Sequence, residues 1–262
     1  MQNFSLTVAK IEMFRRNGAE SIEGALGTGF FYRSADHLFL ITNWHNVTGL
    51  DAVTQKALHS QGLLPNFVRI HYKQWSDPAR SAIRSHGCEL ALYKDDKPIW
   101  FEHSNRFGVD VVAIPLSMDL FTDFANLCIN EVPQQNDLEV SAGMDCFILG
   151  FPEGLFGAAF TPIWKRGSIA SEPFKNYPYY VDSATRKGMS GSPVIARHTG
   201  FYGTNGTVLT GNEIIGTVER FIAIYSGRVG DDALGFQLGT AWQSTVLDDI
   251  LTLATLGSHP LG

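Results

Sequence analysis

The sequence predicts an all-β protein, and three observations support this. Short apolar or alternating segments recur along the chain, with turn residues between them about every 8 to 12 residues. Long helical periodicity is nearly absent. Hydrophobic residues make up 44% of the 262 positions and charged residues 18%, a composition typical of a globular chain that buries a large core. We therefore expect a β-sandwich or β-barrel architecture.

The first half of the chain holds about half of the predicted strands. Segments 27–33 (GTGFFYR) and 37–43 (HLFLITN) are predicted to form a hairpin around Ser34-Ala35-Asp36. A short helix is predicted near 46–60. The other strands predicted in this half are 67–73, 89–94, 98–103 and 109–116.

A similar number of strands is predicted after the polar segment 126–139, which separates the two halves. These strands are 144–152, 162–170, 177–184, 192–197, 214–227 and 233–242. A helix is predicted at the C-terminus, because Trp242, Val246, Ile250 and Leu253 repeat at helical spacing and would cover one face. We expect one domain over 1–262, with a seam between an N-terminal half, 1–128, and a C-terminal half, 129–262.

Charge and hydropathy exclude several function classes. The net charge is −6 and no basic stripe occurs, so nucleic-acid binding is not expected. No apolar run approaches the length of a membrane span. The eight histidines lack paired ligand spacing, so no metal site is expected.

The N-terminal residues and the cysteines bear on the cellular compartment. Charged residues from Lys10 onward break the apolar stretch that a secretion signal needs, so we expect a cytoplasmic protein. Cys88, Cys128 and Cys146 are too few, and odd in number, for a disulfide framework, so free thiols are expected. Cys128 and Cys146 are predicted to be buried.

The segment GMSGSPV, 188–194, places Ser190 among glycines. Such a segment is often only a turn, so a nucleophilic role for Ser190 requires a base and an acid elsewhere. His45 follows the apolar segment FLITNW and is a candidate base, although a structural histidine is the alternative. Asp110 adjoins aliphatic residues and is a candidate acid, although a turn residue or a structural ion pair is the alternative.

In chain order these residues are His45, Asp110 and Ser190, the order of the trypsin/chymotrypsin-like serine peptidases, which the chain resembles over about residues 22–245. TNWHNV resembles the family's T-A-A-H segment, VDVVAIPL its D-[IV]-A-L-[IL] strand, and GMSGSPV its G-D-S-G-G-P segment. FIAIYSG resembles the strand that carries a serine near the acid, here Ser226. Ser192, in G-x-S-G-S-P, makes the chain more similar to bacterial and glutamyl-endopeptidase-like branches.

The resemblance implies a fold and a role for each motif residue. The fold would be two packed six-stranded antiparallel β-barrels with a C-terminal helix. Ser190 would attack the scissile carbonyl, His45 would act as general base and then general acid, and Asp110 would orient His45 with support from Ser226. The backbone N–H groups of Gly188 and Ser190 would form the oxyanion hole, and no cofactor is implied.

Substrate recognition is also inferred from the resemblance. The pocket positions are Ala184, Thr185, Tyr225, Gly227, Arg228 and Gly235. Ala184 stands where trypsin-like enzymes place an acid, so Arg or Lys is not expected before the cut. An inward Arg228 would favour an acidic residue there, whereas an Arg228 that points to solvent would leave Ala184 and Gly235 to form a pocket for a bulky apolar residue. The backbone of 226–228 would pair with an extended substrate. Met189 replaces an aspartate that secreted members use in zymogen activation, so that form of activation is not expected.

Three functions remain open on the sequence. The leading one is an intracellular bacterial serine endopeptidase that acts on a protein or peptide. The second is a catalytically silent peptidase fold that serves as a binding module. The third is an effector that a regulatory protein partner activates. Labelling of Ser190 by a fluorophosphonate would separate the first from the second, and comparing activity alone and in lysate would test the third.

Overall fold

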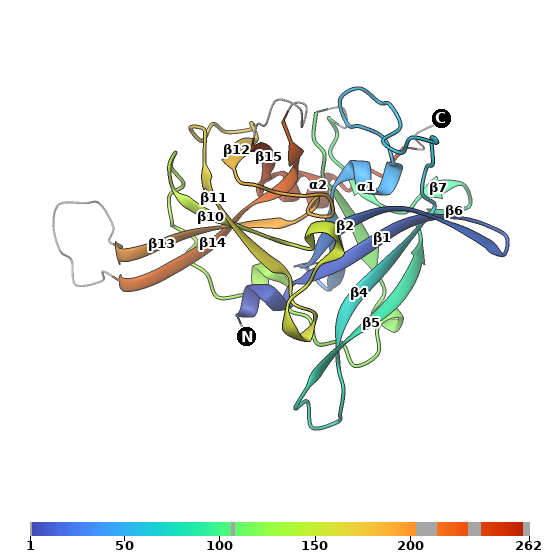
Figure 1. Ribbon diagram of the computed structural model, residues 1–262, viewed down its shortest axis with the longest axis horizontal. Coiled ribbons are helices and arrows are strands. Elements are labelled where there is room, and N and C mark those ends of the chain that lie inside the picture. Colours follow the sequence, from blue (N-terminus) through green and yellow to red (C-terminus); the bar gives the residue numbers. More distant parts are fainter. Residues whose placement is uncertain (1, 106–107, 203–213, 230–236, 259–262) are drawn as a thin grey trace.

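The computed structural model describes residues 2–105, 108–202, 214–229 and 237–258. These residues form mainly antiparallel strands with a helix near the C-terminus, as predicted (Figure 1). The strands up to residue 116 and those from residue 145 belong to different sheets. The polar segment 126–139 lies in the connection between them.

Seven strands form the first sheet, in the order β5-β4-β1-β2-β3-β9-β8. Within the described residues no ladder joins the edge strands β5 and β8, so this sheet differs from the six-stranded barrel expected for this half. The strands are β1 (Val8–Asn17), β2 (Glu20–Ser34), β3 (His37–Thr42), β4 (Phe67–Trp75), β5 (Ile83–Ala91), β8 (Phe101–Glu102) and β9 (Val112–Leu116), and β6 (Tyr93–Lys94) pairs separately with β7 (Lys97–Pro98).

Strand β1 was not among the predicted strands, although its sequence carries the pattern. Ile11 and Met13 are buried, whereas Lys10 and Glu12, which alternate with them, are half-buried on the other face. The predicted hairpin at 34–36 is confirmed, because Ser34 pairs with His37. The strand predicted over 109–116 begins only at Val112.

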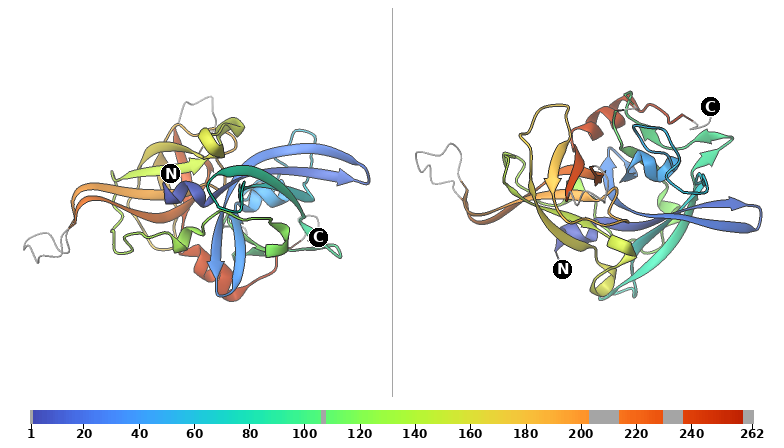
Figure 2. Two further views of the ribbon diagram at one scale, coloured as in Figure 1. Left: turned by 90° about the horizontal axis from the view of Figure 1, so that it is seen from below. Right: turned by 45° about the horizontal axis from the view of Figure 1, so that its top comes forward.

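Six strands of the second half form a closed antiparallel barrel, in the order β10-β11-β12-β15-β14-β13. Each of the strands predicted in this half overlaps one of them. Their bounds are β10 (Asp145–Gly150), β11 (Ile163–Ile169), β12 (Tyr179–Asp182), β13 (Pro193–Tyr202), β14 (Ile214–Arg228) and β15 (Leu238–Gln243). The β13–β14 hairpin and the β1–β2 hairpin project at opposite ends of the molecule (Figure 1 and Figure 2).

Each helix differs from its prediction in one respect. The first is shorter, and the C-terminal one buries a different face. Helix α1 (Trp44–Thr48) is a single turn rather than a helix over 46–60, because Gly49 adopts φ = 73° and ends it. Helix α2 (Val246–Leu253) is confirmed, but it buries Leu247 and Ile250 while Leu253 is 60% exposed. Trp242, predicted on the same helical face, lies in β15.

One of the three apolar clusters in the described residues joins the first sheet to the barrel. Phe30 of β2 meets Phe221 of β14 edge to face, with ring centroids 5.2 Å apart. Buried residues from both sheets and from α2 join them in one cluster, which contains Phe39, Val111, Leu149, Ile195, Leu247 and Ile250 among others. This packing fixes the two sheets against each other, so residues at the seam are held on rigid structure.

Two further expectations concern burial and membrane insertion. Cys128 and Cys146 are buried, as predicted, and burial raises the pKa of the Cys146 thiol to about 12. Among the described residues, no helix has the length and apolarity needed to cross a membrane.

Candidate active site

Strand pairing brings His45 and Asp110 together from positions 65 residues apart. Strand β3 ends at Thr42 and pairs with Val112, the first residue of β9. The residues that follow β3 therefore adjoin the residues that precede β9. Helix α1 begins at Trp44, and its single turn carries His45 at this junction.

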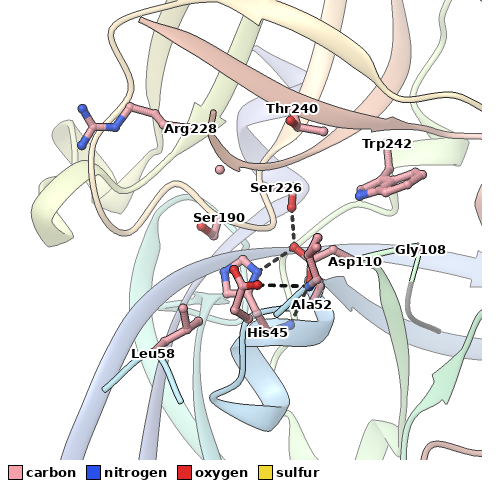
Figure 3. Close-up of a pocket in the computed structure, with 13 residues that line it drawn as sticks. His45, Ala52, Leu58, Gly108, Asp110, Ser190, Ser226, Arg228, Thr240 and Trp242 are labelled. Atoms are coloured by element: carbon pink, nitrogen blue, oxygen red, sulfur yellow. Dashed lines mark hydrogen bonds and ion pairs between the residues drawn. The ribbon is translucent and has the colours of Figure 1, made fainter. Parts of the chain in front are cut away.

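The imidazole of His45 and the carboxylate of Asp110 are directly bonded. His45 Nδ1 lies 2.7 Å from Asp110 Oδ2, and the backbone N–H of His45 donates to Asp110 Oδ1 at 2.9 Å. The hydroxyl of Ser226, at the end of β14, also donates to Asp110 Oδ2 (Figure 3). These contacts fix the ring orientation and the tautomer, so that Nε2 is the nitrogen free to accept a proton.

Asp110 is held in place by its surroundings. Its side chain is buried, and the Asn43 amide donates to its backbone oxygen at 2.7 Å. A buried carboxylate is tolerated when hydrogen bonds or an opposite charge compensate it, and here several groups do so. This arrangement agrees with the predicted contact between the acid and Nδ1 of the base.

The environment of His45 changes its pKa. Burial lowers the pKa of the imidazole, but the charge of Asp110 and its hydrogen bond outweigh burial, and Asp51 contributes in the same direction. The net result is a pKa above the usual value. A raised pKa makes His45 a stronger base, as a group that must take a proton from a hydroxyl requires.

Ser190 lies in the same cleft as His45, on the loop that precedes β13 (Figure 3). Among the described residues no hydrogen bond joins its hydroxyl to the His45 ring. Its backbone oxygen accepts from Thr28 N of β2 at 2.8 Å and from Asn46 Nδ2 of α1 at 3.2 Å. The loop is therefore tied both to the first sheet and to the helix that carries His45.

The backbone hydrogen bonds around Ser190 fix the direction of two N–H groups, those of Gly188 and Ser190. Glu153 N donates to Lys187 O at 2.7 Å, and Ser192 N donates to Met189 O at 3.1 Å. A trans peptide places its N–H opposite its C=O, so these bonds turn the N–H groups of Gly188 and Ser190 the other way. Within the described residues neither N–H has a hydrogen-bond acceptor. Two such donors beside the Ser190 hydroxyl suit a developing oxyanion.

The glycines on either side of Ser190 are required by their conformations. Gly188 has φ = 89° and Gly191 has φ = 87°, values that residues with a Cβ rarely adopt. A Cβ on Gly188 would overlap the carbonyl oxygen of Phe151, and one on Gly191 would overlap that of Thr28. The G-x-S-G spacing thus reflects two tight backbone approaches to neighbouring segments.

Two cavities flank His45 and Ser190. The first, of about 320 Å³, is bordered by the end of β14 and by Trp242; we call it the β14 cleft (Figure 3). The second, of about 510 Å³, lies against the β1–β2 hairpin; we call it the hairpin cavity. An extended chain that passes Ser190 would have room on both sides of the bond under attack.

The predicted pocket residues are only partly brought to this site. Gly227 and Arg228 line the β14 cleft. Thr185 and Tyr225 are instead buried, with their hydroxyls hydrogen-bonded to each other, and line neither cavity. Tyr225 is buried because its ring packs over Gly239 on the neighbouring strand. Ala184 is half-buried and also lines neither cavity, and Gly235 lies outside the described residues.

Several residues that hold the site were not predicted. Thr28, Asn43 and Asn46 act through hydrogen bonds to backbone oxygens, and Glu153 acts through its backbone N–H. No motif distinguishes such residues from ordinary buried polar residues. Asn43 and Asn46 are the exceptions, because both lie in the TNWHNV segment around His45.

No family model and no curated protein matches the chain. No cluster of three or more His, Cys, Asp or Glu side chains that could hold a metal ion occurs among the described residues. The candidate site is therefore interpreted from its geometry.

Proposed function

We propose that the protein is a serine endopeptidase in which Ser190, His45 and Asp110 form a catalytic triad. The main support is the convergence of three separate features around Ser190. These are the bonded pair of His45 and Asp110, the adjacent Ser190, and the N–H groups of Gly188 and Ser190, which have no acceptor among the described residues. A chance cluster of polar residues would not combine a base, its orienting acid and an oxyanion site.

The proposed reaction begins when His45 Nε2 takes the proton of the Ser190 hydroxyl while its oxygen attacks a peptide carbonyl. The imidazolium that forms is stabilised by Asp110, and the oxyanion receives the N–H groups of Gly188 and Ser190. His45 then gives the proton to the leaving amine, which breaks the peptide bond and leaves an acyl-enzyme. A water molecule, activated by His45, releases the acid and restores Ser190.

The proposal also covers the fold, the substrate and the cellular location. We regard the seven-stranded sheet as a variant of the first of two barrels in a chymotrypsin-like architecture, since its partner is a closed six-stranded barrel. The triad order along the chain and the seam location support this assignment. The substrate would be a protein or peptide and no cofactor would be needed. The sparse cysteines favour a cytoplasmic location, and the resemblance of G-x-S-G-S-P to bacterial branches favours a bacterial enzyme.

A fluorophosphonate probe tests the proposal directly, because it phosphonylates only a serine that a neighbouring base activates. We expect the purified protein to be labelled at one site, with mass spectrometry of the digest assigning it to Ser190. Ser190→Ala should abolish both labelling and the hydrolysis of a peptide library. Ser141→Ala, which removes an exposed serine elsewhere, is the matched control and should change neither.

A second candidate is a partner-activated or catalytically silent peptidase fold. It is favoured by one observation, the lack of a hydrogen bond between Ser190 and His45 in the described residues. Such bonds are often long in free enzymes and tighten when substrate binds, so the first candidate is preferred. Failure of the probe to label the folded, purified wild-type protein would favour the second candidate.

A further inference from the structure

The hairpin cavity is lined mainly by carbon. Its volume of about 510 Å³ falls in the range of ligand pockets, about 300–1,000 Å³. Leu26 is 40% exposed and Leu58 is 54% exposed at its border, whereas Met13 and Leu63 are buried in its wall. The apolar side chains that line the cavity are Met13, Ala25, Leu26, Leu58, Leu63 and Pro65.

The cavity owes its shape to an irregularity in the β1–β2 hairpin. The pairing register shifts after Met13, so that Gly24 is the extra residue on β2. A Cβ on Gly24 would crowd the backbone oxygen of Met13 and the side chain of Leu63. Bulges of this kind re-aim side chains next to functional sites, and this one brings the β1–β2 wall against the loop that follows α1.

The cavity is continuous with the reactive groups. His45, Gly188 and Ser190 belong to its lining, so a ligand in it touches the nucleophile, the base and an oxyanion donor. Apolar surface also continues outward from it. Leu26 faces Gly154, and the next residues, Leu155 and Phe156, are 64% and 54% exposed. Exposed apolar surface that runs into a polar reactive centre indicates a place where an apolar ligand is held for reaction.

We propose that the hairpin cavity binds a bulky apolar side chain of the peptide substrate, Leu, Met or Phe in kind, on the side of the scissile bond away from β14. This inference rests on the proposed function and adds a substrate class to it. Besides His45 and His59, the ionisable residues of the lining are Glu153 and Lys187. These two are exposed at the rim and of opposite sign, so together they favour neither an acidic nor a basic side chain.

A binding experiment tests the cavity without requiring catalysis. Ser190→Ala protein with ¹³C-labelled methionine methyl groups is titrated with an alanine-rich decapeptide that carries one Phe, and with the same peptide carrying Asp instead. We expect the Met13 methyl resonance to shift with the Phe peptide and its affinity to exceed that of the Asp peptide by about tenfold to hundredfold. Equal affinities, or no shift at Met13, would overturn the inference.

A second variant ties the preference to the cavity. Leu26→Gln, made in the Ser190→Ala background, should reduce the affinity for the Phe peptide by about fivefold or more, because it removes apolar surface from the border. Leu253→Gln, which changes an exposed leucine at the end of α2, is the matched control and should leave the affinity unchanged. Equal effects of the two variants would also contradict the inference.

Cleavage of a peptide library by the otherwise unchanged enzyme separates this inference from the proposed function. Enrichment of Leu, Met or Phe at one position on one side of the cut, lost in Leu26→Gln, supports both. Hydrolysis without such a preference refutes the apolar pocket and leaves the peptidase intact. Selective binding of the Phe peptide without any hydrolysis supports the pocket and refutes the peptidase.

Discussion

The hydroxyl of Thr28 donates to the carbonyl oxygen of Gly188 at 2.7 Å, across 160 residues of chain. The backbone N–H of the same threonine donates to Ser190 O, and Thr42 Oγ1 donates to Thr28 O at 2.8 Å. Thr28 is fully buried on β2, so its position is fixed by the first sheet. One residue of the first sheet thus orients two peptide groups of the segment that carries Ser190.

Thr28→Val should lower kcat of the proposed peptidase by about ten- to hundredfold with a smaller change in KM. Valine keeps the volume but loses the bond to Gly188 O and the bond from Phe151 N. The Gly188–Met189 peptide, which lies between the two peptides that carry the oxyanion donors, then loses its fixed orientation, and small misplacements at a reacting centre are costly. Steady-state kinetics on a peptide substrate measures this. Thr28→Ser, which restores the hydroxyl, should recover most of the rate.

Thr7→Val is the matched control for Thr28→Val. Thr7 is also fully buried, and its hydroxyl bonds a backbone oxygen, that of Phe4, away from the cleft. Both valine variants should lose similar stability, about 1 kcal/mol, but only Thr28→Val should lose activity. Equal losses of kcat in the two would indicate that Thr28 has a purely structural role.

The sequence carried enough information to name His45, Asp110, Ser190 and Ser226 as one site. Three of them lie at or next to strand ends, in segments with apolar flanks, and Ser190 lies between two glycines. Their meeting depends on the pairing of β3 with β9 and on the packing of the sheet against the barrel. The resemblance to a known order of motifs supplied that long-range information, which periodicity alone does not contain.

Other parts of the site depend on contacts that local sequence does not encode. Thr28 and Glu153 position backbone groups of the 187–190 segment, and any buried polar residue or turn residue is compatible with their local sequence. The burial of Tyr225 arises from its packing over Gly239 on the next strand of the barrel. The alternation in β1, in contrast, was present in the sequence and would have predicted the missing strand.

Asp110→Asn should lower the hydrolysis rate by a factor on the order of 10⁴, because the imidazolium loses its counter-charge and the preferred tautomer of His45 is no longer enforced. The pKa of His45 should fall, since burial continues to lower it while the charge of Asp110 is gone. Titration of the His45 ring by NMR measures the pKa. Asp36→Asn, in an exposed turn, is the control and should change neither quantity.

The raised pKa of His45 also fixes the sign of two pH dependences. In the proposed mechanism the neutral ring is the active base, so the wild-type rate should rise with pH through a midpoint above about 6.5. The protonated ring is stabilised in the folded protein, so its contribution to stability is present below the unfolded pKa and disappears as pH rises through the folded one. A rate midpoint below that of an unperturbed histidine would contradict both.

Lys73→Met should stabilise the protein at pH 7 by about 1–3 kcal/mol. The Lys73 side chain is 1% exposed and its ammonium donates to Val8 O at 3.0 Å, and burial lowers its pKa to about 8. Burying the charged Lys73 ammonium costs about 3 kcal/mol of folding free energy. This cost exceeds the stability that its hydrogen bond to Val8 O contributes and that methionine loses. Chemical unfolding of wild type and variant measures the difference.

The pH dependence of that difference is the sharper test. Between pH 8 and about 10.5 the unfolded chain binds a proton at Lys73 that the folded protein does not, so wild-type stability should gain with rising pH in this window. The advantage of Lys73→Met should therefore shrink as pH rises. Lys175→Met, at an exposed lysine, should show no such trend. A stability gain of Lys73→Met that stays constant from pH 7 to 10 would show that the Lys73 ammonium is not buried in its charged form.

Gly188→Ala should damage the oxyanion site more than the fold. The backbone at Gly188 has φ = 89°, and a Cβ there would overlap Phe151 O, so either residue 188 or the Phe151–Gly154 turn must move. The first movement displaces the Gly188 N–H, and the second takes Glu153 N away from Lys187 O. Loss of one oxyanion donor typically costs about 10²–10³ in kcat, and labelling by a fluorophosphonate should slow as well.

Gly143→Ala isolates the effect, because Gly143 has a similar φ of 84° with nothing within 4 Å of the added Cβ. The control should lose about 1 kcal/mol of stability and keep full activity. Full activity in Gly188→Ala would show that its N–H does not contact the reacting carbonyl.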